Sequence, residues 1–203
     1  MVPKIPTIVE IRASTVVLST PDASATVVRV GENLAVKLGR TVTLLEADNL
    51  RFLSTNSKVP VPEVYATMVE PETNSKFIVM EYIDAKILAD LWPCLEAPDK
   101  LEIVGQIRAI LQDLRSLKPP SYFGSLDRRP LEDGCFWTPG RNPAMSGPFD
   151  TEDDLNEGML KKMAGTQHQK YLAFLRTVMS WQRYCAIIKS NSLTGICKLK
   201  IFL

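Results

Sequence analysis

The chain has 203 residues, of which 45% are hydrophobic, and a formal net charge of +1. This length can bury a sizeable core in one large domain or in two modest lobes. No stretch approaches the roughly 18 apolar residues that span a membrane, the N-terminus lacks the apolar run of a signal peptide, and no concentrated basic face suits nucleic acid. We therefore expect a cytoplasmic protein with no nucleic-acid or membrane partner.

Charge is distributed unevenly along the sequence. Residues 1–157 carry 16 basic and 23 acidic groups, a net charge of −7, whereas residues 158–203 carry eight basic groups and no acidic one. The basic residues of this tail are spread among apolar residues, so we interpret them as solvated charges and not as a polyanion site. The four cysteines form no Cys-x-x-Cys pair and His168 is the only histidine, which favours free thiols over a zinc site.

The first elements in chain order are a leader, a hairpin and a helix. Residues 1–24 contain one short apolar run followed by turn-forming residues, and we assign them no element. Residues 25–30 and 34–38 are β-branched runs on either side of a Gly-containing connection, which predicts a β-hairpin. From Thr43 to Leu53, leucines lie among helix-forming and charged residues, and this predicts an amphipathic helix.

Two further strands and a long helix follow. The prolines in residues 59–62 exclude a helix there, and residues 63–69 and 76–83 then have the pattern of strands on either side of a turn. Together with the hairpin they predict a small antiparallel sheet with one inserted helix. Residues 98–117 carry apolar side chains at helical spacing and give the strongest helix signal of the sequence.

The second half of the sequence alternates between a long loop and short helical patterns. Residues 122–148 are rich in Gly, Pro, Asp and Arg, which is typical of a functional or docking loop. The acidic run after Asp150 favours a helix start, and the helix should extend to about Ala164. We expect a further helix at residues 171–179 and a short hairpin at residues 187–196.

One lysine and one glutamate have a placement that suggests chemistry. Lys37 lies near the end of the second predicted strand, and Glu46 lies in the helix that follows. In kinases a strand ammonium reaches the phosphates of ATP, and a carboxylate of the adjoining helix holds it in place. The alternative is a pair of unrelated charges, an exposed strand lysine and a solvated helix glutamate. These two residues alone do not decide between the interpretations.

A third element favours the kinase interpretation. Residues 77–83, Phe-Ile-Val-Met-Glu-Tyr-Ile, followed by residues 84–88, resemble the hinge of kinase folds, where the main chain after a buried strand hydrogen-bonds the adenine. The hairpin, the lysine, the helical glutamate and this hinge occur in the order that such a fold requires. Three further segments are similar to segments of aminoglycoside phosphotransferase-like and choline-kinase-like proteins: residues 59–65, 122–127 and 147–156.

The resemblance implies a bilobal, protein-kinase-like α+β fold. An N-lobe of a small antiparallel sheet with one helix would span residues 1–84, leader included, and residues 85–203 would form an incomplete helical C-lobe with a divergent tail. The family transfers the γ-phosphate of ATP, through magnesium, to a small-molecule hydroxyl acceptor. No Gly-x-Gly-x-x-Gly loop is present. By position, the phosphate lysine is Lys37, its partner is Glu46, and the adenine contact is the backbone of Glu81, Tyr82 and Ile83.

The residues that perform phosphoryl transfer in this family are missing from their expected places. The family supplies a catalytic aspartate in a His-Gly-Asp loop and a metal-binding aspartate in a later Asp-Trp-Glu-like turn, and transfer needs both. His168 is followed by Gln-Lys, and no acidic residue lies beyond Glu157. We therefore predict that the chain retains an ATP cleft, is inactive as it stands, and lacks the carboxylates that hold magnesium.

Three interpretations of this pattern stay open. The chain can be an evolved pseudokinase, or it can be a truncated, mis-spliced or frame-shifted version of an active phosphotransferase. It can also be a non-enzymatic protein-interaction module. An incomplete second lobe leaves apolar surface uncovered, so we expect self-association through an exposed apolar C-lobe surface.

Overall fold

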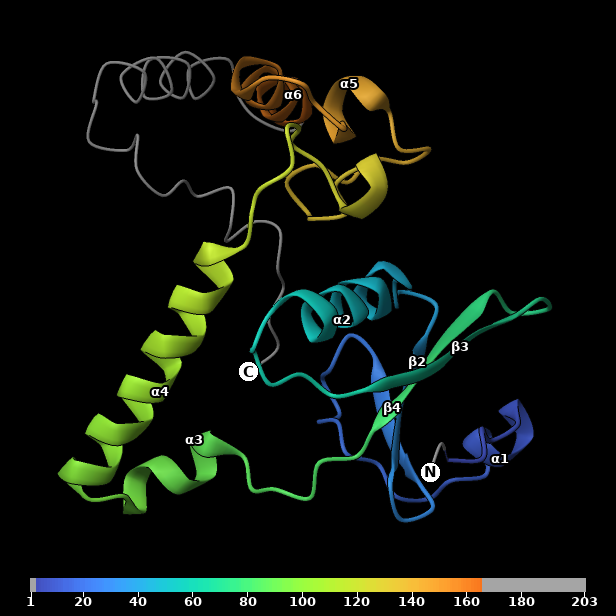
Figure 1. Cartoon of the computed structure of the whole chain (residues 1–203). Coiled ribbons are helices and arrows are strands. Elements are labelled where there is room, and N and C mark those ends of the chain that lie inside the picture. The colour runs from blue at the N-terminus through green and yellow to red at the C-terminus, as the bar shows by residue number, and fades with distance from the viewer. Residues whose placement is uncertain (1–2, 166–203) are drawn as a thin grey trace. The chain divides into compact units, whose positions relative to one another are not determined.

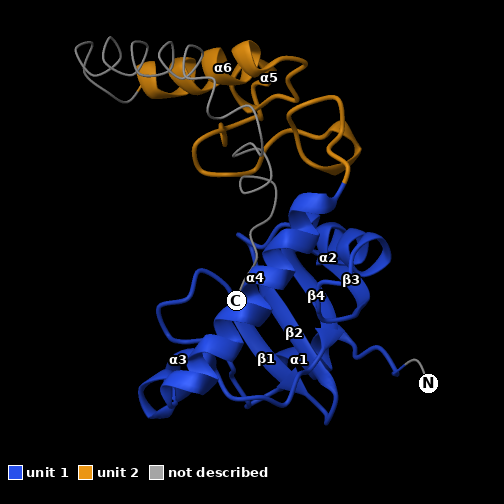
Figure 2. Cartoon of the chain, turned by 60° about the vertical axis from the view of Figure 1, so that its left-hand side comes forward, with its two compact units in different colours: residues 1–117 blue, residues 118–203 orange. Residues whose placement is uncertain are grey.

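The computed structural model describes residues 3–165 of the chain. By internal packing the chain divides into two compact units, unit 1 at residues 1–117 and unit 2 at residues 118–203 (Figure 2). The sequence predicts a boundary between two lobes after residue 84, which differs from this division after residue 117. That lobe boundary stays a prediction. Among the described residues, no helix combines the length and the apolar character needed to cross a membrane.

Unit 1 is built around a four-stranded antiparallel sheet (Figure 1). The strands lie in the order β1-β2-β4-β3, so that β1 pairs with β2, β2 with β4, and β4 with β3. The predicted hairpin and the two predicted strands are confirmed, and with the inserted helix they confirm the α+β fold class. The strands are β1 Thr26–Val30, β2 Leu34–Gly39, β3 Val64–Glu70 and β4 Ser75–Glu81.

Alternation along the strands gives the sheet two faces, each with its own apolar core. On the first, which we call the leader face, Val36 and Phe77 are fully buried in the largest core cluster. On the second, which we call the α2 face, Ile78 is fully buried against Val42 and Ala47. The register of a strand residue therefore decides which of the two cores it joins.

The leader is part of the sheet's core, although the sequence pattern assigned it no element. Residues Ile8–Arg12 form α1, which begins with a capping box between Thr7 and Glu10. Ile11 of α1 is 1% exposed and packs into the leader-face core. A helix of five residues is too short for hydrophobic periodicity to reveal, but the Thr-x-x-Glu pattern was a signal of its start.

Helix α2 (Leu45–Asn56) connects β2 to β3 and covers the α2 face. Its Ala47 is fully buried, and its first turn carries two acidic residues, which the positive end of the helix dipole stabilises. The helix predicted from Thr43 to Leu53 is thus confirmed, with a start two residues later. This placement brings the first turn of α2 next to β2.

After β4 the chain forms α3 (Leu88–Leu91), a 3₁₀ turn (Trp92–Cys94) and α4 (Ala97–Ser116). Helix α4 confirms the predicted long helix, but none of its residues is buried. The N–H of Lys58 donates to the Asp113 carboxylate of α4 at 2.8 Å. Because no residue of α4 is buried, the apolar stripe that identified this helix in the sequence stays largely uncovered in unit 1.

In its described part, unit 2 has little regular structure. Two short elements, a 3₁₀ turn at Leu126–Arg128 and α5 at Pro143–Ser146, lie within the predicted loop. Helix α6 (Glu152–Ala164) confirms the predicted helix with the acidic start, and Thr151 caps it. Two predicted elements lie outside the described residues: the helix at 171–179 and the hairpin at 187–196.

Candidate functional site

Two charged side chains on the α2 face form a close ion pair. Lys37 lies in β2 opposite Ile78 of β4, and since cross-strand neighbours share a face, its side chain lies on the α2 face. The Lys37 Nζ donates to both carboxylate oxygens of Glu46, at 2.9 Å to Oε1 and 2.8 Å to Oε2. The two side chains are only 12% and 20% exposed. The structure thus brings together the lysine and the glutamate that the sequence singled out.

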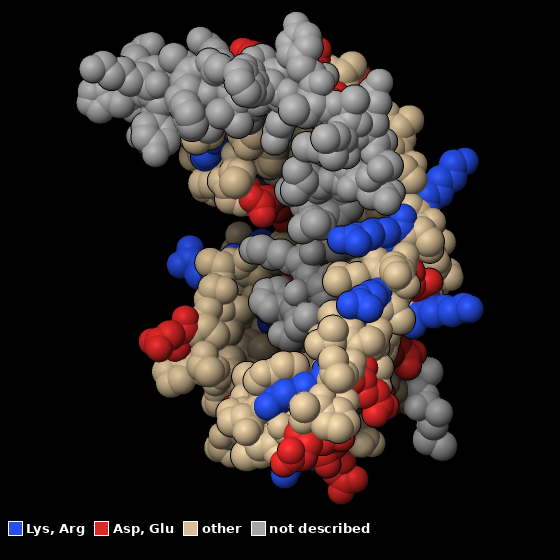
Figure 3. Space-filling view, turned by 90° about the vertical axis from the view of Figure 1, so that its left-hand side faces the viewer, with Lys and Arg blue, Asp and Glu red and all other residues tan. Residues whose placement is uncertain are grey.

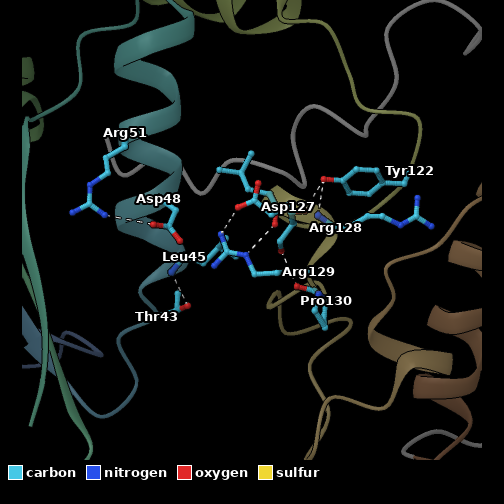
Figure 4. Close-up of polar contacts among 11 residues, drawn as sticks. Thr43, Leu45, Asp48, Arg51, Tyr122, Asp127, Arg128, Arg129 and Pro130 are labelled. Atoms are coloured by element: carbon cyan, nitrogen blue, oxygen red, sulfur yellow. Dashed lines mark hydrogen bonds and ion pairs between the residues drawn. The ribbon is translucent and has the colours of Figure 1, made fainter.

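The connection from β2 to α2 sets the direction of Glu46. Gly39 ends β2 with a φ of 152°, a conformation that favours glycine. The Thr43 hydroxyl oxygen then accepts from the Leu45 N–H at 3.3 Å, at the base of α2 (Figure 4). Because Ala47 is fully buried, α2 cannot rotate without opening its core. This packing holds the neighbouring Glu46 toward Lys37.

The main chain that leaves β4 offers an unpaired donor. The N–H of Glu81 donates to Glu63 O at 2.8 Å, and the N–H of Tyr82 donates to Asn33 O at 2.9 Å, which extends the β2 pairing by one residue. The next N–H, that of Ile83, has no hydrogen-bond partner among the described residues. Ile83 is 57% exposed, so a ligand can reach this stretch of backbone.

The side chains of Glu81 and Tyr82 have other contacts. Glu81 Oε2 accepts from the N–H of Glu63 at 3.2 Å. Burial, together with the nearby carboxylates of Glu63 and Glu81, raises the pKa of Tyr65. The Arg29 guanidinium lies over the Tyr82 ring, 4.1 Å from its centre. What these two residues can offer a ligand is therefore mainly their backbone.

A hairpin that the sequence did not predict adjoins the ion pair. The leader pairs with β1 through the N–H of Leu18, which donates to Val27 O at 2.8 Å. Val27 lies directly opposite Lys37 in the sheet. The connecting residues 19–25 therefore enter β1 next to the lysine. This connection contains no glycine, so it lacks the sequence pattern of a glycine-rich loop.

The described residues offer cations and backbone donors but no metal-binding cluster. Within residues 3–165, no group of three or more His, Cys, Asp or Glu side chains lies together in a way that could hold a metal ion. Charges of both signs are interspersed on the described surface that Figure 3 shows. The Lys37 ammonium fits a phosphate group, whereas these residues do not by themselves fit a magnesium ion.

The comparison with protein families gives this geometry a context. Residues 14–185 match the model of the phosphotransferase enzyme family. The match includes the whole sheet, α2, the backbone after β4 and the described part of unit 2. A search of curated proteins found no match. The resemblance to aminoglycoside phosphotransferase-like proteins is confirmed: since the family model covers more than half of the chain, the chain belongs to the phosphotransferase enzyme family.

Proposed function

We propose that the chain binds ATP on the α2 face of its sheet and does not transfer the phosphate as it stands. The observation that carries the proposal is the Lys37–Glu46 pair, in which one ammonium donates to both oxygens of one carboxylate. Membership of a phosphotransferase family suggests a nucleotide and a small hydroxylated molecule as ligands. ATP is the ligand for which unit 1 has matching groups.

Each end of ATP has a counterpart in unit 1. The Lys37 ammonium would bind phosphate oxygens, and the Glu46 carboxylate would keep the ammonium in place. The Glu81 carbonyl would accept from the adenine amino group, and the Ile83 N–H would donate to a ring nitrogen. Bound ATP would bring the transferable phosphoryl group. The protein's part is then to bind and orient the nucleotide.

The inactive half of the proposal rests on missing carboxylates. Transfer to a hydroxyl uses one aspartate to orient the acceptor and another to hold magnesium. Residues 158–203 contain neither aspartate nor glutamate, and residues 3–165 contain no metal-binding cluster. A truncated or mis-spliced form of an active enzyme would have the same features. Translating the neighbouring coding DNA and looking for His-Gly-Asp followed by Asp-Trp-Glu distinguishes the two.

Calorimetric titration with ATP tests the cleft. Wild type should bind, and Lys37→Met should weaken binding at least about tenfold, because a charge-assisted contact to phosphate is lost. Lys58→Met, which removes an exposed lysine of the same unit, is the matched control and should bind as wild type does. No binding by wild type, with or without magnesium, would overturn the nucleotide proposal, and ATP turnover with any small hydroxylated acceptor would overturn the inactive half.

A non-enzymatic interaction module is the second candidate, and α4 favours it. Leu101 is 72% exposed, and Val104 and Leu111 are 41% and 40% exposed. Apolar side chains gathered on an exposed surface mark a contact site. We propose a second copy of the chain as its partner. The exposed free thiol of Cys94 fits a reducing compartment, so we place the protein in the cytoplasm.

A further inference from the structure

Arg29 is a cation near the end of β1, on the same sheet face as Lys37. Arg29 lies opposite Ala35 of β2, two residues before Lys37. Residues two apart in a strand share a face, so Arg29 projects on the α2 face. Its partner Ala35 lies closer than Lys37 to the start of β2, where the Tyr82 N–H donates to Asn33 O.

The contacts of Arg29 tie the β1–β2 turn to the backbone that follows β4. Its guanidinium lies over the Tyr82 ring at 4.1 Å, and its terminal nitrogen donates to Glu32 O in the turn at 2.9 Å. Among the described residues it has no carboxylate partner, and its Nε is buried without a hydrogen-bond partner. A half-buried guanidinium with an unsatisfied donor is unfavourable by itself, so the stack on Tyr82 and the hydrogen bond to Glu32 O together hold it in place.

The segment after Tyr82 has few other restraints. Ile83 is 57% exposed and Ile87 is 65% exposed. Between them, the only backbone hydrogen bond in the described structure joins the Ala85 N–H to Ile83 O at 3.0 Å. Two side-chain contacts restrain Tyr82, which precedes the Ile83 N–H: the stack with Arg29 at 4.1 Å and a 3.5 Å contact from its hydroxyl to the Asp84 carboxylate. Of these two, the stack is the one that joins the segment to the sheet.

We propose that Arg29 is a positioning residue for nucleotide binding. By clamping Tyr82 against the β1–β2 hairpin, Arg29 holds the Glu81 carbonyl and the Ile83 N–H at a fixed spacing from the Lys37 ammonium. A ligand that spans both ends of the α2 face then meets groups that are already in place, and it loses less conformational freedom on binding. This inference rests on the proposed function, because it assigns the residue that organises the same site.

The test is a double-mutant cycle in ATP affinity on the full chain. Arg29→Met and Tyr82→Leu should each weaken binding about three- to tenfold, the range expected for one cation–aromatic contact. The double variant should be no weaker than either single variant, because both remove the same contact. Tyr82→Phe keeps the ring face but removes the hydroxyl that lies 3.5 Å from the Asp84 carboxylate, so it should recover most of the loss seen with Tyr82→Leu, and Arg29→Lys should recover part of the loss.

A matched control and a second measurement keep the outcomes separate. Arg51→Met changes an exposed arginine of α2 that pairs with Asp48 at 3.5 Å, and it should leave ATP binding unchanged (Figure 4). Without nucleotide, Arg29→Met should speed hydrogen exchange at the hydrogen-bonded Tyr82 and Ala85 amides by about the same three- to tenfold and leave the β4 amides protected.

Two results are distinguishable failures. If wild type binds ATP in a Lys37-dependent way and Arg29→Met binds equally well, the positioning role of Arg29 is overturned and the proposed function stands. If wild type binds no ATP, the proposed function fails, and hydrogen exchange alone decides whether Arg29 orders the segment after β4. Additive losses in the double variant would also contradict the clamp.

Discussion

The contacts inside unit 1 differ in kind from the contacts inside unit 2. In unit 1 the fully buried side chains are apolar, for example Phe77 and Ile78, and the strands add a continuous ladder of backbone hydrogen bonds. In the described part of unit 2 the fully buried side chain is a serine, Ser146, which donates to Phe136 O at 2.7 Å and lies 3.0 Å from the Thr138 hydroxyl. Unit 2 therefore depends on particular side-chain partners more than unit 1 does.

The aromatic centre of unit 2 shows the same dependence. Phe149 is 6% exposed and belongs to a small cluster with Leu131 and Phe136. Its ring packs so closely on α6 that a Cβ added at Gly158 would lie 2.5 Å from the Phe149 Cζ. Backbone hydrogen bonds of 2.8 Å join Phe123 and Phe149 in both directions. One ring thus organises the loop-rich unit 2, whereas the sheet of unit 1 distributes the same task over many residues.

The largest effect is expected from truncating the central phenylalanine of each unit. Phe149→Ala and Phe77→Ala should each cost about 3–5 kcal/mol through lost burial and a cavity. Hydrogen exchange should show that Phe149→Ala exposes the amides of residues 118–165 and leaves the β2 and β4 amides protected. Phe77→Ala should give the reverse pattern. Simultaneous loss of protection in both units for either variant would show that they unfold as one, contrary to this expectation.

Unit 1 could be predicted from the sequence because its pattern is periodic. The β-branched runs located the strands, and the order of strand, turn and helix placed Lys37 beside Glu46. Arg29 was missed because a lone arginine in a strand has the pattern of a solvent-exposed charge. Its contact with Tyr82 joins residues far apart in the sequence, and periodicity carries no information about such a pair.

Unit 2 could not be predicted in the same way. Asp127 and Arg128 both have φ values near the left-handed region, at 56° and 58°, and neither is glycine, so no turn rule located them. The Arg129 side chain completes this turn, because its Nε donates to Leu126 O at 3.0 Å (Figure 4). The acidic start of α6 was predictable, because carboxylates at a helix N-terminus have a direct electrostatic cause.

An intermediate effect is expected on self-association through α4. Leu101→Glu and Leu111→Glu should each raise the dissociation constant of a dimer at least about tenfold, because each replaces an apolar contact by a charge. Gln106→Glu adds the same charge at another position of the helix and is the control. Sedimentation velocity over a range of protein concentrations measures the change. A wild-type chain that stays monomeric throughout would contradict the proposed contact.

The smallest effect is expected at the link between the leader and the β3–β4 turn. Arg12 donates to both carboxylate oxygens of Glu70, and with the Thr73 hydroxyl this holds the pKa of Glu70 below its ordinary value of 4.5. A depressed folded-state pKa stabilises the fold above the unfolded-state pKa, and the contribution is lost as pH falls through the folded-state value. The melting temperature of Glu70→Gln should therefore be at most about 2 °C lower at pH 7.

Melting temperatures of wild type and Glu70→Gln, compared over a pH range, separate the contribution of the Glu70 carboxylate from that of other carboxylates. The pKa of Glu10 is also lowered, by its hydrogen bonds with Thr7, so wild type alone would report both groups. The difference in melting temperature between wild type and Glu70→Gln should shrink as the pH falls below 4.5 and through the lowered folded-state pKa of Glu70. A difference that is constant from pH 7 to pH 3 would mean that the glutamine acts through packing and not through the lost charge.

The packing of α1 has a consequence for cutting the chain into fragments. The family match begins at residue 14, but Ile5, Ile8 and Ile11 contribute to the leader-face core. A fragment that starts where the homology starts would uncover Val28 and Val36 and would present the hidden side of the sheet to solvent. The folding boundary of this protein thus precedes its homology boundary, and fragments for crystallography or binding assays should begin before Ile5.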